Sequence, residues 1–192
     1  MFSDELKKKI RSYKDFPTNN ILFRDITPIL RDPKVFSELI KQMSERALIR
    51  NAECIVAVDA RGFIFASSIS YYLSKPFILA RKPGKLPGEL VESSYRLEYA
   101  ENSLGIQLES IESFKSFAIV DDLLATGGTV NAIANLLNKQ SKLITGLSVV
   151  VELGALNARS KFNFDVASEV NIKQDTNDFF FICPSKIKNL FL

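Results

Sequence analysis

Two adjacent carboxylates followed by a turn of small residues are the part of this sequence best suited to chemistry. Asp121 and Asp122 end the short apolar segment 117–120, and the turn Ala125-Thr126-Gly127-Gly128-Thr129 follows closely. Apolar residues then recur at helical spacing, so a strand, a turn and a helix are expected in that order. The start of a helix presents converging N–H groups and a positive dipole end, which suit a phosphate. Carboxylates at the strand end can bind sugar hydroxyls or approach a phosphate-bound cation. The pattern therefore predicts a cradle for a ribose phosphate.

Asp, Thr and Gly also occur in many turns between a strand and a helix, because they cap helices and tolerate tight dihedral angles. The complete string is more specific than such a turn. Its paired acids, threonines and glycines together resemble the signature with which type I phosphoribosyltransferases bind 5-phosphoribosyl 1-diphosphate (PRPP). The turn lacks the Gly-Lys-Ser/Thr of a nucleoside triphosphate loop and the Gly-x-Gly-x-x-Gly of a dinucleotide site.

Length and composition favour one globular domain over residues 1–192. The chain has 192 residues, 46% of them hydrophobic, which is enough for a sizeable core. The acidic and lysine-rich beginning does not resemble a signal peptide, and no apolar run approaches the length that spans a membrane. Cys54 and Cys183 lie far apart in apolar surroundings, which favours reduced thiols. We therefore expect a cytoplasmic protein without a membrane partner.

Charge and residue content exclude several classes of function. A net charge of +3 is too small to favour a nucleic-acid partner. The sequence contains no histidine, which excludes a histidine general base, the usual serine and cysteine triads, and histidine-ligated metal sites. Proton transfer must therefore use a carboxylate, Tyr, Lys or the substrate itself.

The order of the expected elements indicates an α/β fold. Periodicity predicts helices over 3–13, 33–49 and 63–73, strands over 55–58, 76–80, 117–120, 143–151 and 164–172, hairpin strands over 95–99 and 103–108, an extended piece and turn over 21–28, and an exposed loop over 81–88. Strands that alternate with helices form a doubly wound, mostly parallel sheet with flanking helices. Ligands bind beyond the carboxyl ends of such strands, where residues 59–62, 121–122 and 152–154 fall.

Further motifs extend the resemblance beyond the cradle. In order along the chain these are Phe23-Arg24-Asp25-Ile26-Thr27-Pro28, Ala60-Arg61-Gly62-Phe63, Arg81-Lys82-Pro83-Gly84-Lys85-Leu86-Pro87-Gly88 and Leu97-Glu98-Tyr99. Several independent motifs in one order are far more specific than the cradle alone. With them, about residues 16–156 resemble the adenine phosphoribosyltransferase family.

The resemblance implies a fold and a reaction. The fold would be that of type I phosphoribosyltransferases, with a base-binding hood to which residues 1–33 contribute and a flexible lid loop. The reaction would transfer the 5-phosphoribosyl group of PRPP to N9 of adenine, giving AMP and diphosphate. It would use Mg²⁺ and pass through an oxocarbenium-like transition state, and a homodimer would be the working unit.

The resemblance also assigns the residues that would bind PRPP. Ribose and its 5′-phosphate would contact the acids and the turn, namely Asp121, Asp122, Ala125, Thr126, Gly127, Gly128 and Thr129. Arg61 would bind the leaving diphosphate and act in catalysis, and a non-proline cis peptide is expected at Asp59–Ala60. The lid residues Arg81, Lys82 and Lys85 would close over the diphosphate, with Arg81 reaching the neighbouring subunit. Mg²⁺ would be held through PRPP and water rather than by direct protein ligands.

Adenine would occupy a second part of the same site. Leu22, Phe23 and Arg24 would contact it, and Leu156 would close the pocket from the far side. Glu98 matches a glutamate beside adenine N7, where a carboxylic acid could donate a proton or hydrogen bond as N9 attacks. The sequence departs from the family at Ala100, where glycine is common.

Two other functions share parts of this pattern. A phosphoribosyltransferase for another base would keep the cradle and the Arg61 loop but would differ in the segments around Phe23 and Glu98. A PRPP-binding regulator would keep the fold and add an element that binds DNA or RNA, and no such element is recognisable. A PRPP-forming diphosphokinase is disfavoured because the sequence has no recognisable ATP-binding segment.

Overall fold

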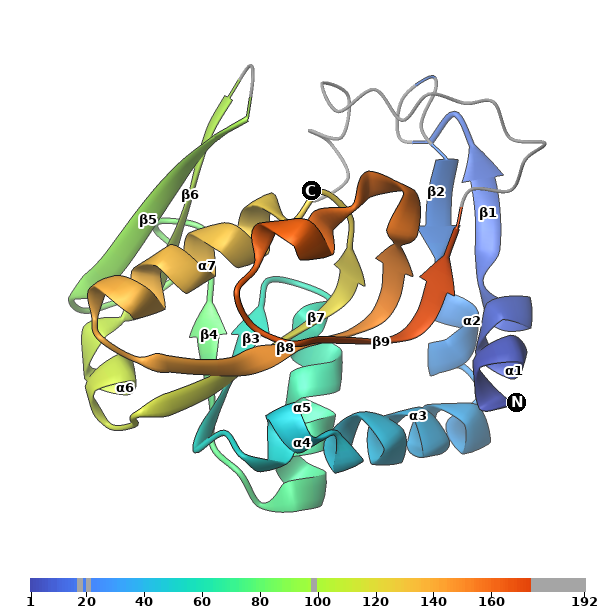
Figure 1. Ribbon diagram of the computed structural model, residues 1–192, viewed down its shortest axis with the longest axis horizontal. Coiled ribbons are helices and arrows are strands. Elements are labelled where there is room, and N and C mark those ends of the chain that lie inside the picture. The colour runs from blue at the N-terminus through green and yellow to red at the C-terminus, as the bar shows by residue number, and fades with distance from the viewer. Residues whose placement is uncertain (17–18, 20–21, 98–99, 174–192) are drawn as a thin grey trace.

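Five parallel strands form the central sheet of the computed structural model, which describes residues 1–16, 19, 22–97 and 100–173. Across the sheet the order is β4-β3-β7-β8-β9 (Figure 1). The strands are β3 (Cys54–Val58), β4 (Phe77–Ala80), β7 (Ser116–Leu124), β8 (Leu143–Leu153) and β9 (Val166–Ile172). Every neighbouring pair is parallel. The expected α/β fold with a parallel sheet is therefore confirmed.

Helices cover both faces of this sheet, because the side chains of its strands are apolar on both sides. Along β7, Phe117 and Ile119 belong to the core on one face, and Ala118 and Val120 to the core on the other. Helices α3 (Pro33–Glu45), α4 (Ala47–Arg50) and α5 (Gly62–Leu73) contribute to the second of these cores, and α6 (Leu108–Glu112) and α7 (Gly128–Lys139) to the first. Alternate residues of one strand thus fix its position between two helical layers.

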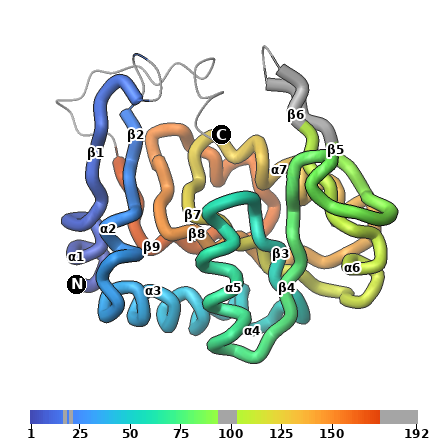
Figure 2. Tube along the Cα trace, turned by 180° about the vertical axis from the view of Figure 1, so that it is seen from behind, coloured from blue at the N-terminus to red at the C-terminus, as the bar shows by residue number. Residues whose placement is uncertain are grey.

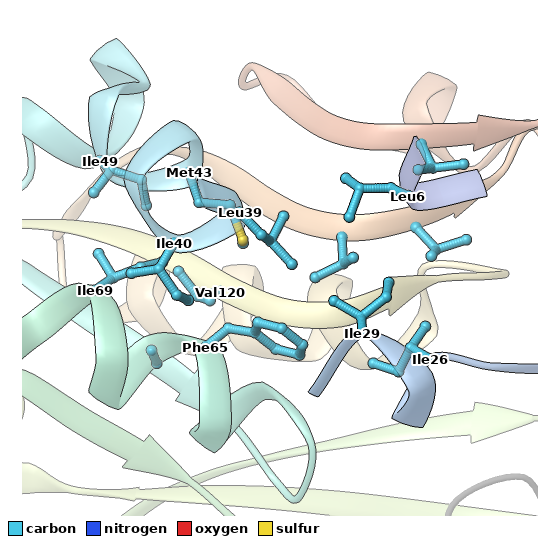
Figure 3. Packing of buried hydrophobic residues seen from close by; sticks show 14 of the residues in the cluster. Leu6, Ile26, Ile29, Leu39, Ile40, Met43, Ile49, Phe65, Ile69 and Val120 are labelled. Carbon is cyan, nitrogen blue, oxygen red and sulfur yellow. The ribbon is translucent and has the colours of Figure 1, made fainter. Parts of the chain in front are cut away.

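Figure 3 shows the core on the α3 and α5 face. Leu39, Ile40 and Met43 of α3 and Phe65 and Ile69 of α5 surround Val120 of β7. The same cluster includes fully buried Leu6 of α1 (Phe2–Lys9) and Ile29 of α2 (Thr27–Leu30). The N-terminal helices are therefore anchored to the core that supports the strands.

Two antiparallel hairpins stand at opposite ends of the sheet and extend past its carboxyl edge in the same direction (Figures 1 and 2). The first pairs β1 (Arg11–Lys14) with β2 (Leu22–Asp25), and the second pairs β5 (Leu90–Leu97) with β6 (Ala100–Gln107). After β8 the chain forms two short 3-10 helices, η1 (Gly154–Leu156) and η2 (Ala158–Lys161). None of the helices in the described ranges combines the length and apolarity needed to cross a membrane.

Two predicted helices have different bounds in the structure. The helix expected over 3–13 ends at Lys9, and Arg11–Lys14 is a strand, because these residues pair with β2 from farther along the chain. The helix expected over 33–49 is interrupted at Arg46, whose ψ of 131° leaves helical geometry. In that position its guanidinium forms two hydrogen bonds, of 3.0 and 2.7 Å, to Glu169 on β9. Tertiary contacts decide both boundaries.

Candidate active site

The chain changes direction across the sheet between β3 and β7, which makes this the switch point of the sheet. From β3 the chain passes through α5 to β4 on one side, and from β7 through α7 to β8 on the other. The two connections lie on opposite faces of the sheet, so their loops diverge at the carboxyl edge. In open parallel sheets such a switch point is where ligands bind. The residues that follow β3 and the end of β7 are those that the sequence assigns to binding.

The phosphate turn has the backbone that an anion site requires. Gly127 has a φ of 79°, in the region that favours glycine, and precedes the first residue of α7. A Cβ there would lie 2.8 Å from the Phe162 ring, so a larger residue would require that ring to shift. The Gly127 carbonyl accepts the first helical hydrogen bond from Asn131 N–H at 2.9 Å. The first N–H groups of an α-helix have no acceptor within the helix, and the positive end of its dipole favours an anion at this point.

The paired acids lie within a strand rather than after it. The expectation that the strand ends at residue 120 is wrong, because β7 continues through both acids to Leu124 along its parallel partner β8. Asp121 and Asp122 are 7% and 3% exposed, and Asp121 accepts a hydrogen bond of 2.8 Å from the Asp122 N–H. Burial, and then the negative charge of Asp122, raise the pKa of Asp121 well above its usual range. Two negative charges on Asp121 and Asp122 together are therefore unfavourable in the folded protein without a bound ligand.

Arg61 connects the loop after β3 to these acids. Its Nε donates a hydrogen bond of 2.5 Å to Oδ2 of Asp122, and its guanidinium carbon lies 5.7 Å from the centre of the Phe23 ring. The peptide between Asp59 and Ala60 is cis, as the resemblance led us to expect. Gly62 follows Arg61, and a Cβ on Gly62 would lie 2.8 Å from the Val120 carbonyl oxygen. The absence of a side chain lets the loop approach β7 closely enough for the Arg61 contact.

Arg81 ties the start of the lid loop to the same region. Its Nε lies 3.0 Å from Oδ2 of Asp59, and its guanidinium carbon lies 5.6 Å from the centre of the Phe63 ring. Its Nη1 donates to the carbonyl of Lys85, 3.3 Å away. In this single chain, therefore, Arg81 contacts the cis-peptide loop of its own subunit.

The lid loop itself agrees with the expected exposed segment. Residues 81–89 contain no named helix or strand and are anchored at both ends. Arg81 and Gly105 exchange backbone hydrogen bonds of 3.0 and 2.7 Å, and Leu108 N–H donates to the Glu89 carbonyl at 2.9 Å. Lys82 and Lys85 lie between these anchors. Backbone hydrogen bonds therefore fix both ends of the loop.

The expected adenine-binding residues come from two different elements. Leu22, Phe23 and Arg24 lie on β2 and are half-buried. The Phe23 ring meets Phe16 edge to face, with centroids 5.2 Å apart. Arg24 Nη1 donates to Ser12 Oγ at 2.5 Å, so its guanidinium is engaged on β1. Leu156 lies in η1, after β8.

The structure thus brings part of the predicted set together. Arg61 touches both the acid pair and the Phe23 ring, so the expected ribose and adenine regions are adjacent. The lid joins this group through Arg81 and Asp59. Glu98 and Tyr99 lie outside the described residues, so the proposed acid stays a prediction.

Sequence reasoning missed a polar network at the end of β8. Buried Glu152 accepts hydrogen bonds from Arg159 Nε and Nη2 at 2.7 and 2.6 Å, from Ser168 at 2.8 Å and from Asn171 at 3.0 Å. Burial alone would raise the pKa of Glu152, but the hydrogen bonds and the charge of Arg159 outweigh it and lower the pKa. Glu152 was singled out only for its place at a strand end, and no motif indicated its partners.

Comparisons with known proteins agree with this geometry. The family model described as "Phosphoribosyl transferase domain" matches residues 26–185, which extends beyond the motifs ending at residue 156. An adenine phosphoribosyltransferase of Prochlorococcus marinus (strain MIT 9215) is 72% identical over 170 residues, 88% of this chain and 99% of the relative. The crystal structure of the adenine phosphoribosyltransferase from Thermoanaerobacter pseudethanolicus has a TM-score of 0.83 and 38% identity, covering 88% and 99% of the two chains. The Saccharomyces cerevisiae enzyme, complexed with an imino-altritol bisphosphate and adenine, has a TM-score of 0.79 and 34% identity, covering 88% and 98%.

Proposed function

Because this chain belongs to the adenine phosphoribosyltransferase family, we propose that it transfers the 5-phosphoribosyl group of PRPP to N9 of adenine, giving AMP and diphosphate. The observation that carries the proposal is the position of Arg61. It lies between the acids of β7 and the Phe23 ring, where diphosphate, ribose and base must meet. A relative 72% identical over nearly its whole length carries the same activity in its name.

The proposed mechanism is mainly electrostatic. As the bond from ribose C1 to the diphosphate oxygen breaks, its electron pair leaves with diphosphate, and positive charge grows on the ribose. Adenine N9 forms the new bond to C1, and the imidazole N–H proton of adenine is released. Arg61 would stabilise the diphosphate, and Arg81, Lys82 and Lys85 would add positive charge when the lid closes. A closed lid would also keep water from the ribose centre.

The β7 acids and the turn would hold the ribose phosphate in line for this attack. Asp121 and Asp122 would accept hydrogen bonds from the ribose hydroxyls, and Asp122 has acceptor sites besides the one that Arg61 Nε uses. The N–H groups and hydroxyls from Ala125, Thr126, Gly127, Gly128 and Thr129 would bind the 5′-phosphate. When both ends of the ribose are fixed, adenine N9 can approach C1 from one direction only. This positioning would increase the reaction rate.

Adenine would bind between the first hairpin and the segment after β8. The Phe23 ring would stack on the base, with Leu22, Arg24 and Leu156 at its edges and Glu98 donating to N7. Backbone groups in this hood, to which residues 1–33 contribute, would select a 6-amino purine, because a 6-oxo purine leaves their hydrogen bonds unpaired. We treat residues 1–192 as one catalytic domain on this basis.

The residues at the site fit a Mg²⁺ ion that PRPP oxygens and water hold. Among the described residues, no three His, Cys, Asp or Glu side chains are grouped to bind a metal. The Asp122 carboxylate beside Arg61 can still receive hydrogen bonds from water around such an ion. Mg²⁺ usually keeps several waters and binds through substrate phosphates and one or two carboxylates. When bound, Mg²⁺ would supply charge neutralisation on the diphosphate.

A homodimer is the proposed assembly, and a second copy of the chain is the proposed occupant of an exposed apolar surface. Ile64 and Tyr71 lie seven residues apart on α5, hence on one helix face, and are 37% and 90% exposed. Tyr72 of α5 and Phe77 on edge strand β4 are also exposed. Light scattering of the purified protein tests this, with Tyr71→Glu expected to yield monomers.

A cytoplasmic location stays a prediction and is consistent with the free thiol of Cys54.

The deciding experiment offers adenine, guanine, hypoxanthine, xanthine and orotate separately, with PRPP and Mg²⁺, and follows nucleotide and diphosphate. AMP from adenine alone supports the proposal. A nucleotide formed from another base instead would assign a different substrate. Retained PRPP binding without any product would favour a PRPP-binding regulator.

A further inference from the structure

The segment that follows η1 covers one side of the phosphate turn. Lys161 Nζ donates a hydrogen bond of 2.7 Å to the carbonyl oxygen of Thr126. The Phe162 ring and the Ala158 Cβ lie against Gly127, at 2.8 and 3.4 Å from where a Cβ would stand. A ligand must therefore approach the turn from the other side.

The Lys161 contact fixes the orientation of one peptide unit in the turn. In a trans peptide the C=O and the following N–H point in opposite directions, and Asp59–Ala60 is the one cis bond in the part of the chain that the structure describes. When Lys161 holds the Thr126 carbonyl on the covered side, the Gly127 N–H points to the open side. Gly127 would otherwise be free to rotate this peptide, since glycine accepts both signs of φ.

Residues 158–162, which cover the phosphate turn, are themselves held in place by hydrogen bonds to the sheet, so the backbone that carries Lys161 is fixed. Arg159 makes its two hydrogen bonds to buried Glu152 and donates to the Val166 carbonyl at 2.5 Å. The Phe162 N–H donates to the Arg159 carbonyl at 3.1 Å. The segment between β8 and β9 is therefore bound to the sheet through Arg159 and to the phosphate turn through Lys161.

We propose that Lys161 is a positioning residue for PRPP, which holds the Gly127 N–H toward the 5′-phosphate through the Thr126 carbonyl. This inference rests on the proposed transfer reaction. It places a residue outside the recognised motifs in the phosphate site. It also links that site to η1, which carries Leu156, so the two substrate regions share one rigid segment.

The test compares steady-state kinetics of Lys161→Met, Lys161→Arg and a matched control. Lys142→Met is the control, because Lys142 Nζ also binds backbone carbonyls, those of Phe114 at 2.8 Å and Glu112 at 3.5 Å, at the amino end of β8. Lys161→Met should raise the KM for PRPP roughly threefold to tenfold, with kcat and the KM for adenine little changed. Lys161→Arg should restore most of the lost affinity, and Lys142→Met should leave every constant unchanged.

Two results would overturn the proposal. One is an unchanged KM for PRPP in Lys161→Met, or an equal rise in the Lys142→Met control. The other is a ratio of mutant to wild-type KM that collapses as salt is raised, because this indicates a direct contact between the ammonium and the phosphate. If the wild-type protein formed no AMP, the proposed reaction would fail by itself, and the Lys161 variants would be compared by calorimetry of PRPP binding.

Discussion

Arg61 and Asp122 are 61 positions apart in the sequence, yet Nε and Oδ2 lie 2.5 Å from each other. The contact joins the loop after β3 to β7 across the switch point of the sheet. Asp122 is almost fully buried and Arg61 is 30% exposed, so the arginine is the partner that a ligand can reach. In the proposed reaction PRPP would therefore meet an Arg61 side chain whose Nε already donates to Asp122.

Replacing Arg61 by alanine should lower kcat by about 10²-fold or more, since it removes a charge that stabilises the leaving diphosphate. The uncompensated Asp122 should also lower the free energy of unfolding by about 1–2 kcal/mol, a figure reduced for the exposure of Arg61. Turnover assays and thermal unfolding measure the two effects. The control is Arg46→Ala, which breaks the pair with Glu169 far from the site and should reduce stability alone. A normal kcat in Arg61→Ala would contradict the proposed role.

The Asp121→Asn variant should be more stable than the wild type at neutral pH and should bind PRPP more weakly. The pKa of Asp121 is raised in the folded state, so between its unfolded value of about 3.9 and its folded value the unfolded chain gives up the proton more readily. Wild-type stability is therefore lost as the pH rises through this window, and asparagine has no such loss. Unfolding of both proteins from pH 4 to pH 8 should show a gap that widens with pH. A gap independent of pH would refute the assignment.

A Glu98→Gln variant should retain PRPP binding but lose turnover, by about 10²-fold to 10⁴-fold if the Glu98 carboxyl group takes part in proton transfer at adenine N7. Glutamine can still donate a hydrogen bond but cannot transfer a proton. Single-turnover rates and PRPP titration separate the two steps. If turnover is unaltered, Glu98 has no acid role.

Glu152→Gln should lower the free energy of unfolding by about 1–2 kcal/mol at pH 7, a value that allows for the exposure of Arg159. The folded pKa of Glu152 is lowered, so its contribution is complete above the unfolded value of about 4.3 and is lost as the pH falls through the folded value. The difference between variant and wild type should thus shrink on acidification. Denaturant unfolding at pH 7, 5 and 4 measures it, and a difference that grew toward acid would exclude the proposed pairing.

Ser148→Ala should stabilise the protein by about 1 kcal/mol, because the Ser148 hydroxyl is fully buried and has no hydrogen-bond partner within the described ranges. The matched control is Ser116→Ala. The Ser116 hydroxyl accepts a hydrogen bond of 3.0 Å from the Glu53 N–H, and its loss should destabilise. Thermal unfolding should move the two variants in opposite directions. A lower Tm for Ser148→Ala would mean that the hydroxyl has a partner after all.

The sequence predicted the parts of the site that depend on local order. The phosphate turn belongs to a short contiguous motif, and its backbone follows from glycine placement and a helix start. The cis peptide before Arg61 was expected from the family resemblance alone. The parallel sheet also followed from the alternation of apolar strands and helices. These features need only neighbours along the chain.

The remainder depends on contacts between distant segments, which periodicity does not contain. Residues 11–14 form a strand because β2 lies beside them. Lys161 meets a carbonyl 35 positions away, and Arg159 gains its role from a buried glutamate on β8. A lysine or arginine in a polar segment looks the same whether it faces water or a partner. Only the folded chain separates the two.

The position of β3 between β4 and β7 has a consequence for how the chain folds. β4 follows β3 closely, but the other neighbour is not made until residues 116–124 leave the ribosome. Until then the fully apolar β3 has one open edge, and its outer hydrogen-bonding groups can pair with another nascent chain. The wait is about 60 residues of synthesis, several seconds at typical elongation rates. Slow translation before β7 should therefore increase aggregation of newly made protein, whereas the finished strand order protects the mature one.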